Sequence, residues 1–488
     1  MSKLKSFIGE TLIYGLGGIF SRVFVFFLIP LYTQYLGKED YSNLIMLQSV
    51  FTILSFVLAL NAGVFFYYYE YKTYKYKKII LTSWFYYQLV VSILLMVFLF
   101  LFSGFLSNFF IVNTANVETL KLCIALLGLQ LLPYAFNTTY LNYFRIERKP
   151  KAATIVVLVE AAFTLLFVYV SLVFLNNGLL GIIVSLVLAR ASVAVLYLPK
   201  ARIFINISNF SKKLLAKLVE YSWPFFLTSV FTWIIVSVDK FIGTQFLTNQ
   251  SEVAILALAM QLTLPITILS DMIRMAIAPF VMSIRKDSDS DQSYQQIFDL
   301  SVFTSSFISI GLIMGTPFLT ILLSDSSYLE VIFLVPLFAF AKVISIAANQ
   351  FSISFSLVKK NVFIVYAIII GGVIGVLLNL FFMKSFGYIV AGYSQIIAYL
   401  IMSAFLYFTG KKIAEMNIHI ANSAIIISFM LIYTLATFIG SEKLVEGKYL
   451  THILLGIITG ILTIVSYLVA NRINLKSLML SILKKQKV

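Results

Sequence analysis

Residues 9–36 read GETLIYGLGGIFSRVFVFFLIPLYTQYL, a long apolar run that holds one arginine, Arg22, near its middle. About 20 such residues cross the hydrocarbon core of a bilayer as a single helix. The run is continuously apolar rather than alternating, which favours a membrane helix over a β-barrel strand. We therefore expect a membrane-spanning helix over residues 9–33 with a charge at mid-depth.

The rest of the chain extends this pattern. Of its 488 residues, 61% are hydrophobic and only 11% are charged. A soluble fold of this size would have to hide more apolar surface than its interior can hold. The sequence therefore predicts an all-α integral membrane protein with fourteen transmembrane helices. Their predicted ranges are 9–33, 43–67, 79–103, 119–142, 153–175, 179–199, 219–243, 253–282, 298–323, 330–357, 361–383, 387–409, 421–440 and 450–471.

The basic residues predict the orientation of these helices. When the N-terminus is placed inside, the inner segments hold 26 Lys and Arg and the outer loops hold five. Cytoplasmic loops of membrane proteins carry such an excess, so both termini are expected in the cytoplasm. The longest inner loop, residues 200–218, is expected to lie along the membrane surface with its lysines toward lipid headgroups. Cys123 is the single cysteine, which excludes an internal disulfide.

The chain repeats itself at an offset of 211 residues. TQYL at 33–36 corresponds to TQFL at 244–247, and FRIERKP at 144–150 corresponds to FSLVKKN at 355–361. Gly181 falls on Gly392 in the same register. Helices 1–6 thus match helices 7–12, and an even number of helices in each repeat makes the two repeats parallel. Two six-helix lobes that meet around a central site are typical of transporters, and the predicted divisions are 1–205, 206–415 and an addition at 416–488.

Two charges lie deep in predicted helices and continue polar stripes. Thr11, Gly15, Gly18 and Arg22 recur at helical spacing on the first helix. On the tenth helix a longer stripe follows the same spacing over almost four turns, and it consists of Lys342, Ser345, Asn349, Ser352 and Ser356. A charge at mid-bilayer usually faces an aqueous cavity. A structural ion pair for the arginine and interhelical hydrogen bonds for the second stripe are the alternatives.

Other charges within the spans divide into two groups. Asp271 and Arg274 lie one turn apart on the eighth helix and can pair with each other, and Pro265 and Pro279 are expected to kink that helix. Glu160, Arg190, Asp239 and Lys240 lie nearer to helix ends, where snorkelling toward water explains them.

The deepest charges are mostly positive, which predicts a cavity that selects anions. Arg22, Arg274 and Lys342 are the candidates to bind a phosphate group, because arginine grips phosphate as a planar fork and lysine adds a point charge. Gly15, Gly18, Ser345, Asn349 and Ser352 are expected to line the cavity.

No nucleotide-binding loop, zinc motif or nucleophile elbow occurs in the sequence, so we expect no enzyme activity, no cofactor and no metal. Transport must then depend on an ion gradient or on the gradient of the substrate itself. Asp271, Glu160 and Asp239 are the carboxylates within the spans that are candidates to bind H⁺ or Na⁺.

Three stretches resemble bacterial polysaccharide flippases of the multidrug, oligosaccharidyl-lipid and polysaccharide exporter superfamily. They are GETLIYGLGGIFSRVFVFFLIPLYTQYLGKEDYSNL (9–44), LNAGVFFYYYEY (60–71) and KLLAKLVEYSWPFFLTSVFTWIIVSVDKFIG (213–243). The layout of six, six and two helices is similar over the whole chain. The resemblance implies a V-shaped bundle in the bacterial inner membrane that alternates between inward-open and outward-open states.

The same resemblance implies a substrate, undecaprenyl-diphosphate-linked oligosaccharide, which moves from the cytoplasmic to the outer leaflet. It implies membrane lipids as surroundings, and a polysaccharide polymerase and glycosyltransferases as partners in O-antigen, capsule or related synthesis, with no nucleic acid. The drug exporters of the superfamily tend to carry acidic residues in the cavity, and here the first helix carries an arginine. A cation-coupled drug exporter and a membrane enzyme such as a polymerase or acyltransferase stay open as alternatives.

Overall fold

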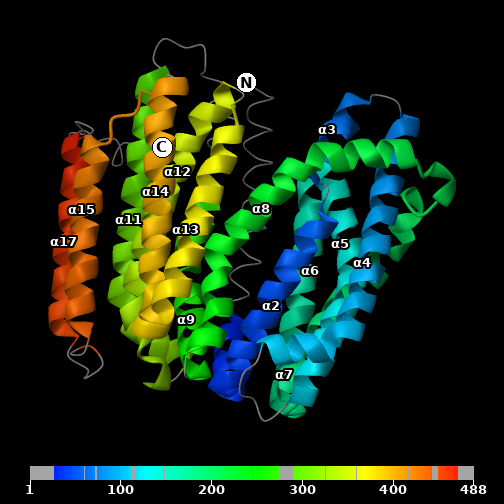
Figure 1. Ribbon diagram of the computed structural model, residues 1–488, viewed down its shortest axis with the longest axis horizontal. Coiled ribbons are helices and arrows are strands. Elements are labelled where there is room, and N and C mark those ends of the chain that lie inside the picture. Colours follow the sequence, from blue (N-terminus) through cyan, green and yellow to red (C-terminus); the bar gives the residue numbers. More distant parts are fainter. Residues whose placement is uncertain are drawn as a thin grey trace, which may run out of the picture. The chain divides into compact units, whose positions relative to one another are not determined.

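The computed structural model describes a chain that is helical throughout its regular structure, and no strand occurs in the described residues (Figure 1). These residues are 27–59, 61–71, 74–110, 117–147, 149–247, 249–271, 273, 290–324, 326–358, 360–414, 417–441, 444 and 449–470. The helices are α2 Lys38–Leu58, α3 Asn61–Glu70, α4 Tyr74–Phe110, α5 Val117–Ile146, α6 Pro150–Tyr169, α7 Gly178–Tyr197, α8 Lys212–Phe246, α9 Gln250–Leu262, α11 Ser290–Leu323, α12 Val331–Leu357, α13 Val362–Phe386, α14 Val390–Ile413, α15 Ala421–Ile439 and α17 Leu450–Ala470.

The predicted membrane spans correspond to these helices. Eleven described stretches are long and apolar enough to cross a membrane, and a bent pair, Ser251–Leu262 with Leu264–Asp271, makes a twelfth. One of the stretches, Val362–Ile413, contains both α13 and α14 and so supplies two crossings. Every predicted span but the first therefore has a described helix. The first, 9–33, lies largely outside the described residues.

The chain forms two compact units, Met1–Ala254 and Ile255–Val488. In the first, α4 to α7 pack against one another, and α8 packs on α2, α3 and α4. In the second, α12 packs against α11, α14 and α15, and α17 lies beside α11 and α15 at one edge (Figure 1). The repeat assigns α8 to the second lobe, whereas its contacts place it in the first unit. The three divisions drawn from the sequence stay a prediction.

The predicted second span, 43–67, lies within one apolar stretch, Lys38–Tyr68, and the helix is interrupted at Ala59 between α2 and α3. A helix end inside a membrane leaves carbonyl groups that lipid cannot satisfy. Here side chains of α4 satisfy them: Tyr87 donates to the carbonyl oxygen of Val57 at 2.7 Å and Gln88 to that of Leu58 at 3.2 Å. The break is therefore a stable feature of the first unit.

The repeat is visible in the hydrogen bonds that end the helices. The Lys149 amide donates to the Phe144 carbonyl at 2.8 Å, and the Lys360 amide donates to the Phe355 carbonyl at 2.9 Å. Both donor and acceptor are displaced by the offset of 211 residues that the sequence predicts. The Leu36 amide to Tyr32 and the Leu247 amide to Gly243 form a second such pair. The structure thus confirms the register of the two repeats.

The last two helices attach to the second unit through α11. His452 of α17 stacks on Tyr433 of α15 with ring centroids 5.6 Å apart, and its Nε2 lies 3.1 Å from the carbonyl oxygen of Ile313 on α11. A Cβ at Gly456 would lie 3.0 Å from the sulfur of Met314, so α17 and α11 are in close contact. The described helices of the addition predicted at 416–488, α15 and α17, thus pack on α11, and α15 also packs on α12.

The predicted surface segment, 200–218, consists of two short 3-10 turns and the start of α8. It packs on α4, where Tyr86 donates to the carbonyl of Ile205 at 2.6 Å and the Ser211 amide donates to Ser83 at 2.9 Å. Ser211 also caps α8 by accepting from the Leu214 amide. The lysines of this segment, Lys200, Lys212, Lys213 and Lys217, are exposed, as a surface position requires.

Candidate functional site

Four of the predicted site residues lie outside the described residues, namely Gly15, Gly18, Arg22 and Arg274. Their placement in a cationic cavity stays a prediction. The others, on α12, α8, α6 and the helical segment after α9, are described and can be compared with expectation.

Helix α12 is the most enclosed of the single spans that the structure describes. Of its membrane-spanning window 83% is buried inside the protein, against 44% or less for each of the other described single spans. Its neighbours α11, α14 and α15 cover most of its circumference. A helix so placed has only a narrow face left for water, lipid or a ligand.

The polar stripe of α12 lies on that narrow face. Lys342, Ser345, Asn349 and Ser352 are half-buried, whereas most residues between them are fully buried. Ser345 donates to the carbonyl of Lys342 at 2.9 Å, and Ser352 donates to that of Asn349 at 2.6 Å. Both hydroxyls therefore donate their hydrogen bond to the backbone of α12, and their oxygen lone pairs remain able to accept one.

The chemistry of this face suits a polar or anionic ligand. Lysine offers three donors and a positive charge, and an asparagine amide offers two donors and an acceptor. Gln350 shows the contrast, because it lies on the buried side and donates to Ser301 of α11 at 3.1 Å. A polar residue on the enclosed side thus joins two helices, whereas the half-buried stripe residues lie on the other side of α12.

The expected kink after α9 is present. The segments Ser251–Leu262 and Leu264–Asp271 meet at an angle of 40°, with Thr263 between them. Proline lacks an amide hydrogen, so Pro265 cannot donate to the carbonyl four residues earlier and the helix bends there. Asp271 is half-buried at the end of the second segment. Its proposed partner, Arg274, is not among the described residues.

A polar cluster lies inside the first unit, on four helices. Arg190 of α7 pairs with Glu160 of α6, with 3.1 Å between Nε and Oε1. Asn137 of α5 donates to Glu160 Oε2 at 3.3 Å and to the backbone carbonyl of Arg190 at 3.1 Å. The guanidinium carbon lies 4.1 Å from the ring centroid of Phe51 on α2 and 5.5 Å from that of Tyr134 on α5. Both partners of a deep ion pair are thereby held by hydrogen bonds and aromatic faces.

This cluster corrects the expectation that Glu160 and Arg190 snorkel toward water. Their side chains are 28% and 18% exposed, and each is oriented toward the other inside the unit. Charges within a membrane that cannot reach water are stabilised by pairing. The sequence could have indicated this pair, because Glu160 and Arg190 carry opposite charges and lie on consecutive helices. The contacts of the pair with Asn137, Phe51 and Tyr134 were not predicted.

Asp239 and Lys240 near the end of α8 are also enclosed rather than snorkelled. Asp239 is 1% exposed and Lys240 is 9% exposed. The Asp239 Oδ1 accepts the Lys240 backbone amide at 2.9 Å. The carboxylate is thus buried within the protein, which the sequence reading did not expect.

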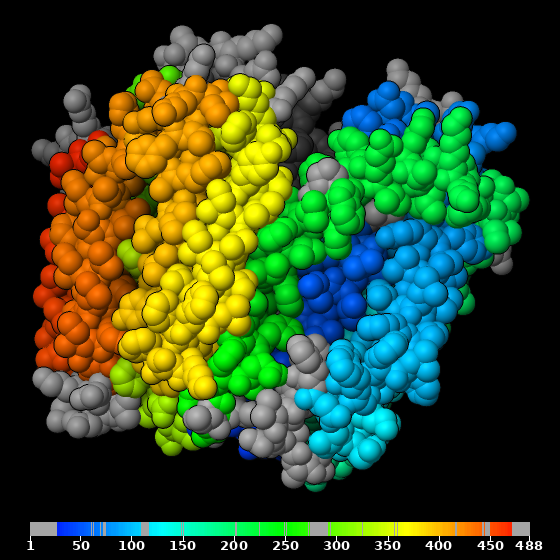
Figure 2. Space-filling view, in the orientation of Figure 1, coloured from blue at the N-terminus to red at the C-terminus, as the bar shows by residue number. Residues whose placement is uncertain are grey.

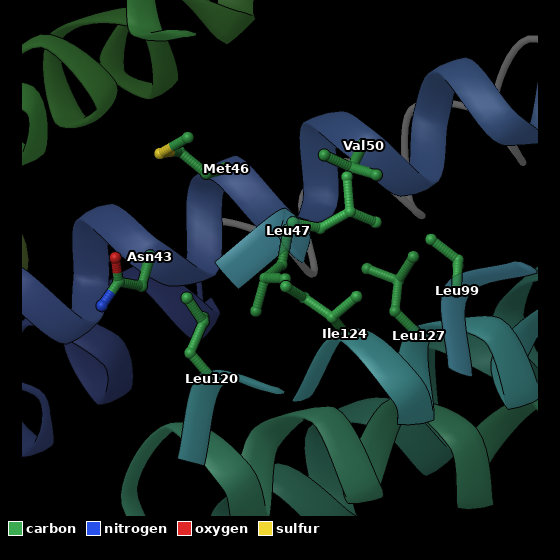
Figure 3. A pocket seen from close by; sticks show the side chains of 9 residues that line it. Asn43, Met46, Leu47, Val50, Leu99, Leu120, Ile124 and Leu127 are labelled. Carbon is green, nitrogen blue, oxygen red and sulfur yellow. The ribbon is translucent and has the colours of Figure 1, made fainter. Parts of the chain in front are cut away.

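A cavity between α2, α4 and α5 has a different character (Figure 3). Its volume of about 20 Å³ is room for about one water molecule. Asn43 is the one polar residue among its lining side chains, which are otherwise aliphatic apart from Met46. It is a packing gap and has no features of a substrate site. Within the described residues, no group of three His, Cys, Asp or Glu side chains could hold a metal ion.

Solved structures with the same fold are transporters. The lipid II flippase MurJ in an inward closed conformation has a TM-score of 0.73 at 15% identity, over 94% of this chain and 99% of that one. An inward-facing multidrug resistance MATE family transporter of the MOP superfamily has a TM-score of 0.68 at 12% identity, over 83% of this chain and 94% of that one. Its outward-facing conformation has a TM-score of 0.58 at 14% identity, over 84% and 96%. At these identities the likeness shows the fold alone.

Sequence comparison gives a closer assignment. A family model described as polysaccharide biosynthesis protein matches residues 36–290, slightly more than half of the 488 residues. No curated protein sequence matches the chain. The matched region begins just after the first predicted span, 9–33, and continues past Ala254, where the first unit ends.

Proposed function

Because the chain belongs to the polysaccharide biosynthesis protein family and has the fold of a MOP-superfamily transporter, we propose that it is a flippase for lipid-linked oligosaccharide. Its substrate is an undecaprenyl diphosphate that carries an oligosaccharide repeat unit. The protein moves it from the cytoplasmic to the outer leaflet of the bacterial inner membrane by alternating access. No chemical bond is made or broken in this reaction.

The observation that carries the proposal is the polar face of α12. A lysine, an asparagine and two serines share the single open side of the most enclosed helix. Such an arrangement is unfavourable next to lipid, and it is well suited to a charged headgroup that crosses the bilayer. Lys342 neutralises part of the diphosphate, and Arg22 and Arg274 are proposed to complete the cationic site.

Coupling to H⁺ or Na⁺ is assigned to Asp271 or Asp239 rather than to Glu160. A cation at Glu160 would have to compete with the Arg190 guanidinium, which already lies 3.1 Å from the carboxylate. Asp239 is buried, and Asp271 follows the kink at Thr263, where a change of helix direction alters its surroundings. Transport that needs neither ion would instead depend on the gradient of the substrate.

The test is flipping in proteoliposomes. A fluorescent undecaprenyl-diphosphate oligosaccharide is reconstituted with the protein, and the fraction in the outer leaflet is read with an impermeant quencher. We expect flipping by the wild type and loss of flipping by Arg22→Ala, with normal membrane insertion.

Two other results would count against the proposal. Normal flipping by Arg22→Ala and Lys342→Ala together would exclude the cationic site. Absence of flipping by an active wild type, together with ion-driven export of organic cations, would favour a drug exporter of the same superfamily.

A further inference from the structure

Helices α3 and α8 cross in direct backbone contact. The Gly63 amide donates to the Ser222 hydroxyl at 2.9 Å, and a Cβ at Gly63 would lie 2.5 Å from the Leu218 carbonyl oxygen. Residues about one turn beyond Gly63 on α3 and beyond Leu218 and Ser222 on α8 therefore lie next to each other. These are Phe66 on α3, and Tyr221 and Phe225 on α8, and all are aromatic.

Six rings continue from this crossing as an aromatic ladder, defined here as Phe66, Tyr67, Tyr71, Tyr76, Tyr221 and Phe225. Tyr221 stacks on Phe66 with centroids 4.5 Å apart and on Phe225 at 6.0 Å. In the other direction Tyr67 meets Tyr221 edge to face at 6.0 Å, Tyr71 stacks on Tyr67 at 6.0 Å, and Tyr76 stacks on Tyr71 at 5.1 Å. The ladder joins both helices to the start of α4.

The ladder lies on the surface of the first unit. Phe225 at one end is 53% exposed and Tyr76 at the other end is 48% exposed, and Phe66 in between is 44% exposed. Figures 1 and 2 show the start of α8 running over this end of the unit next to α3. Each terminal ring therefore keeps open surface for a further ring to stack on it.

The position of the ladder is at the water boundary and not in the lipid core. Glu70, Lys75 and Glu220 directly adjoin its rings in sequence and are exposed, and Lys77, which follows Tyr76, is half-buried. No hydrogen bond joins the hydroxyls of Tyr71, Tyr76 or Tyr221 to another residue in the part of the chain that the structure describes. The basic loop at 70–78 is among those that the distribution of Lys and Arg assigns to the cytoplasm.

The chemistry of this surface selects a class of ligand. Stacked aromatic faces with hydroxyls at their edges suit a flat, amphipathic ring that has an apolar face and a polar rim. Among the described residues, the charges next to the rings are two acids, Glu70 and Glu220, and two lysines, Lys75 and Lys77, whereas a patch for anionic lipid headgroups would be expected to be mainly basic. A pyranose ring of an oligosaccharide meets both conditions.

We propose that the aromatic ladder is a docking surface for the sugar part of the lipid-linked substrate, on the cytoplasmic side. This inference rests on the proposed flippase function and deepens it. The cationic residues act on the diphosphate, which every such substrate shares, and the ladder discriminates among oligosaccharides.

The experiment compares headgroups in the proteoliposome assay with the full chain. The probes are undecaprenyl diphosphates that carry a tetrasaccharide of N-acetylglucosamine, galactose or rhamnose, each against the same lipid with a single sugar. We expect Phe225→Ala and Tyr76→Ala each to lower the flipping rate of at least one tetrasaccharide lipid about fivefold, with little change for the single-sugar lipids. Tyr221→Phe keeps the ring and should retain most of the activity.

The matched control is Phe381→Ala on α13, which removes a ring that is 73% exposed and is not part of the ladder. It should change neither rate. Equal losses on both kinds of headgroup, or no loss with any tetrasaccharide, would overturn the proposal. So would a loss that is matched by weaker binding of the protein to vesicles of anionic phospholipid, which would identify a headgroup surface.

A second measurement separates this proposal from the flippase function. Saturation-transfer NMR with the three free tetrasaccharides, on the detergent-solubilised chain, reports docking without transport. Transfer to a tetrasaccharide that is lost in Phe225→Ala supports the ladder even if the wild type flips no lipid. Flipping by the wild type without any such transfer contradicts the ladder and leaves the flippase function standing.

Discussion

Helices α5 and α12 occupy equivalent positions in the two repeats, yet the polar residues that join or line them lie at different positions around the helix. The stripe residues Lys342, Ser345, Asn349 and Ser352 of α12 correspond at the offset of 211 to Leu131, Tyr134, Thr138 and Leu141 of α5. In turn Asn137 of α5, which donates to the Glu160 carboxylate of the half-buried ion pair, corresponds to Ala348 of α12. In α5 the polar Asn137 forms hydrogen bonds to other helices of the first unit. In α12 the polar stripe lies on the half-buried face of the helix.

The comparison teaches that the repeat preserves the backbone and leaves the polar chemistry free to diverge. The helix-ending hydrogen bonds at Phe144 and Phe355 are alike, because backbone groups in a membrane must be satisfied in either half. Side chains have no such constraint. At the offset of 211, Glu160 and Arg190 correspond to Gly371 and Ile401, so the second repeat has no counterpart of this half-buried ion pair.

The largest effect is expected from breaking that ion pair. Glu160→Ala leaves the Arg190 guanidinium enclosed without its carboxylate, and the free energy of unfolding should fall by about 3 kcal/mol. Thermal unfolding in detergent, followed by circular dichroism, measures this. The double variant Glu160→Ala/Arg190→Ile should lose less than the sum of the two single variants. Additive losses would show that the two charges do not interact.

A smaller effect, on transport rather than on stability, is expected on α12. Lys342→Ala removes the charge from the open face, and flipping should fall about a hundredfold, the value of one charge-assisted contact of ~2.7 kcal/mol. Lys342→Arg should keep most of the activity. The control Lys384→Ala removes an exposed lysine at the end of α13 and should have no effect. A Lys342→Ala protein that transports normally would refute a role for the stripe.

The third prediction compares two close helix crossings. Gly63→Ala places a methyl group 2.5 Å from the Leu218 carbonyl oxygen, and a backbone atom cannot move away without separating α3 from α8. We expect the free energy of unfolding to fall by about 2 kcal/mol. At Gly375 on α13 the new methyl would lie 3.7 Å from Ala398, an ordinary contact, so Gly375→Ala should leave the unfolding midpoint nearly unchanged. A larger loss at Gly375 than at Gly63 would contradict this packing.

The smallest effect is expected from a surface ion pair. Lys121 and Glu118 lie 3.8 Å apart on the first turns of α5, with side chains that are 47% and 86% exposed. Water and salt screen such a pair, so Glu118→Gln should shift the unfolding midpoint by less than about one degree. If Glu118→Gln shifted the unfolding midpoint as much as Glu160→Ala, the contribution of the Glu160–Arg190 pair to stability would not depend on its enclosure.

Much of the fold was predictable from residues alone. The positions of the described helices and the stripe on α12 follow from apolar run length and helical spacing, and the structure agrees. The register of the repeat follows from segments that match at an offset of 211 residues. The break between α2 and α3 was not predictable, because Tyr87 and Gln88, which satisfy its free carbonyls, are distant in sequence. The interpretation of Glu160 and Arg190 failed for the same reason, since depth along a helix does not show whether a partner lies on the next one.

The sequence by itself determined that this chain is a helical membrane protein made of two repeats, because lipid leaves the backbone few other solutions. It also determined which residue types share a helical face. Only the tertiary structure decided which faces are covered, and therefore which polar groups pair inside a unit and which stay open to bind. Coverage depends on helices from distant parts of the chain, as at Gly63 and Ser222, and the pattern within one helix does not contain that information.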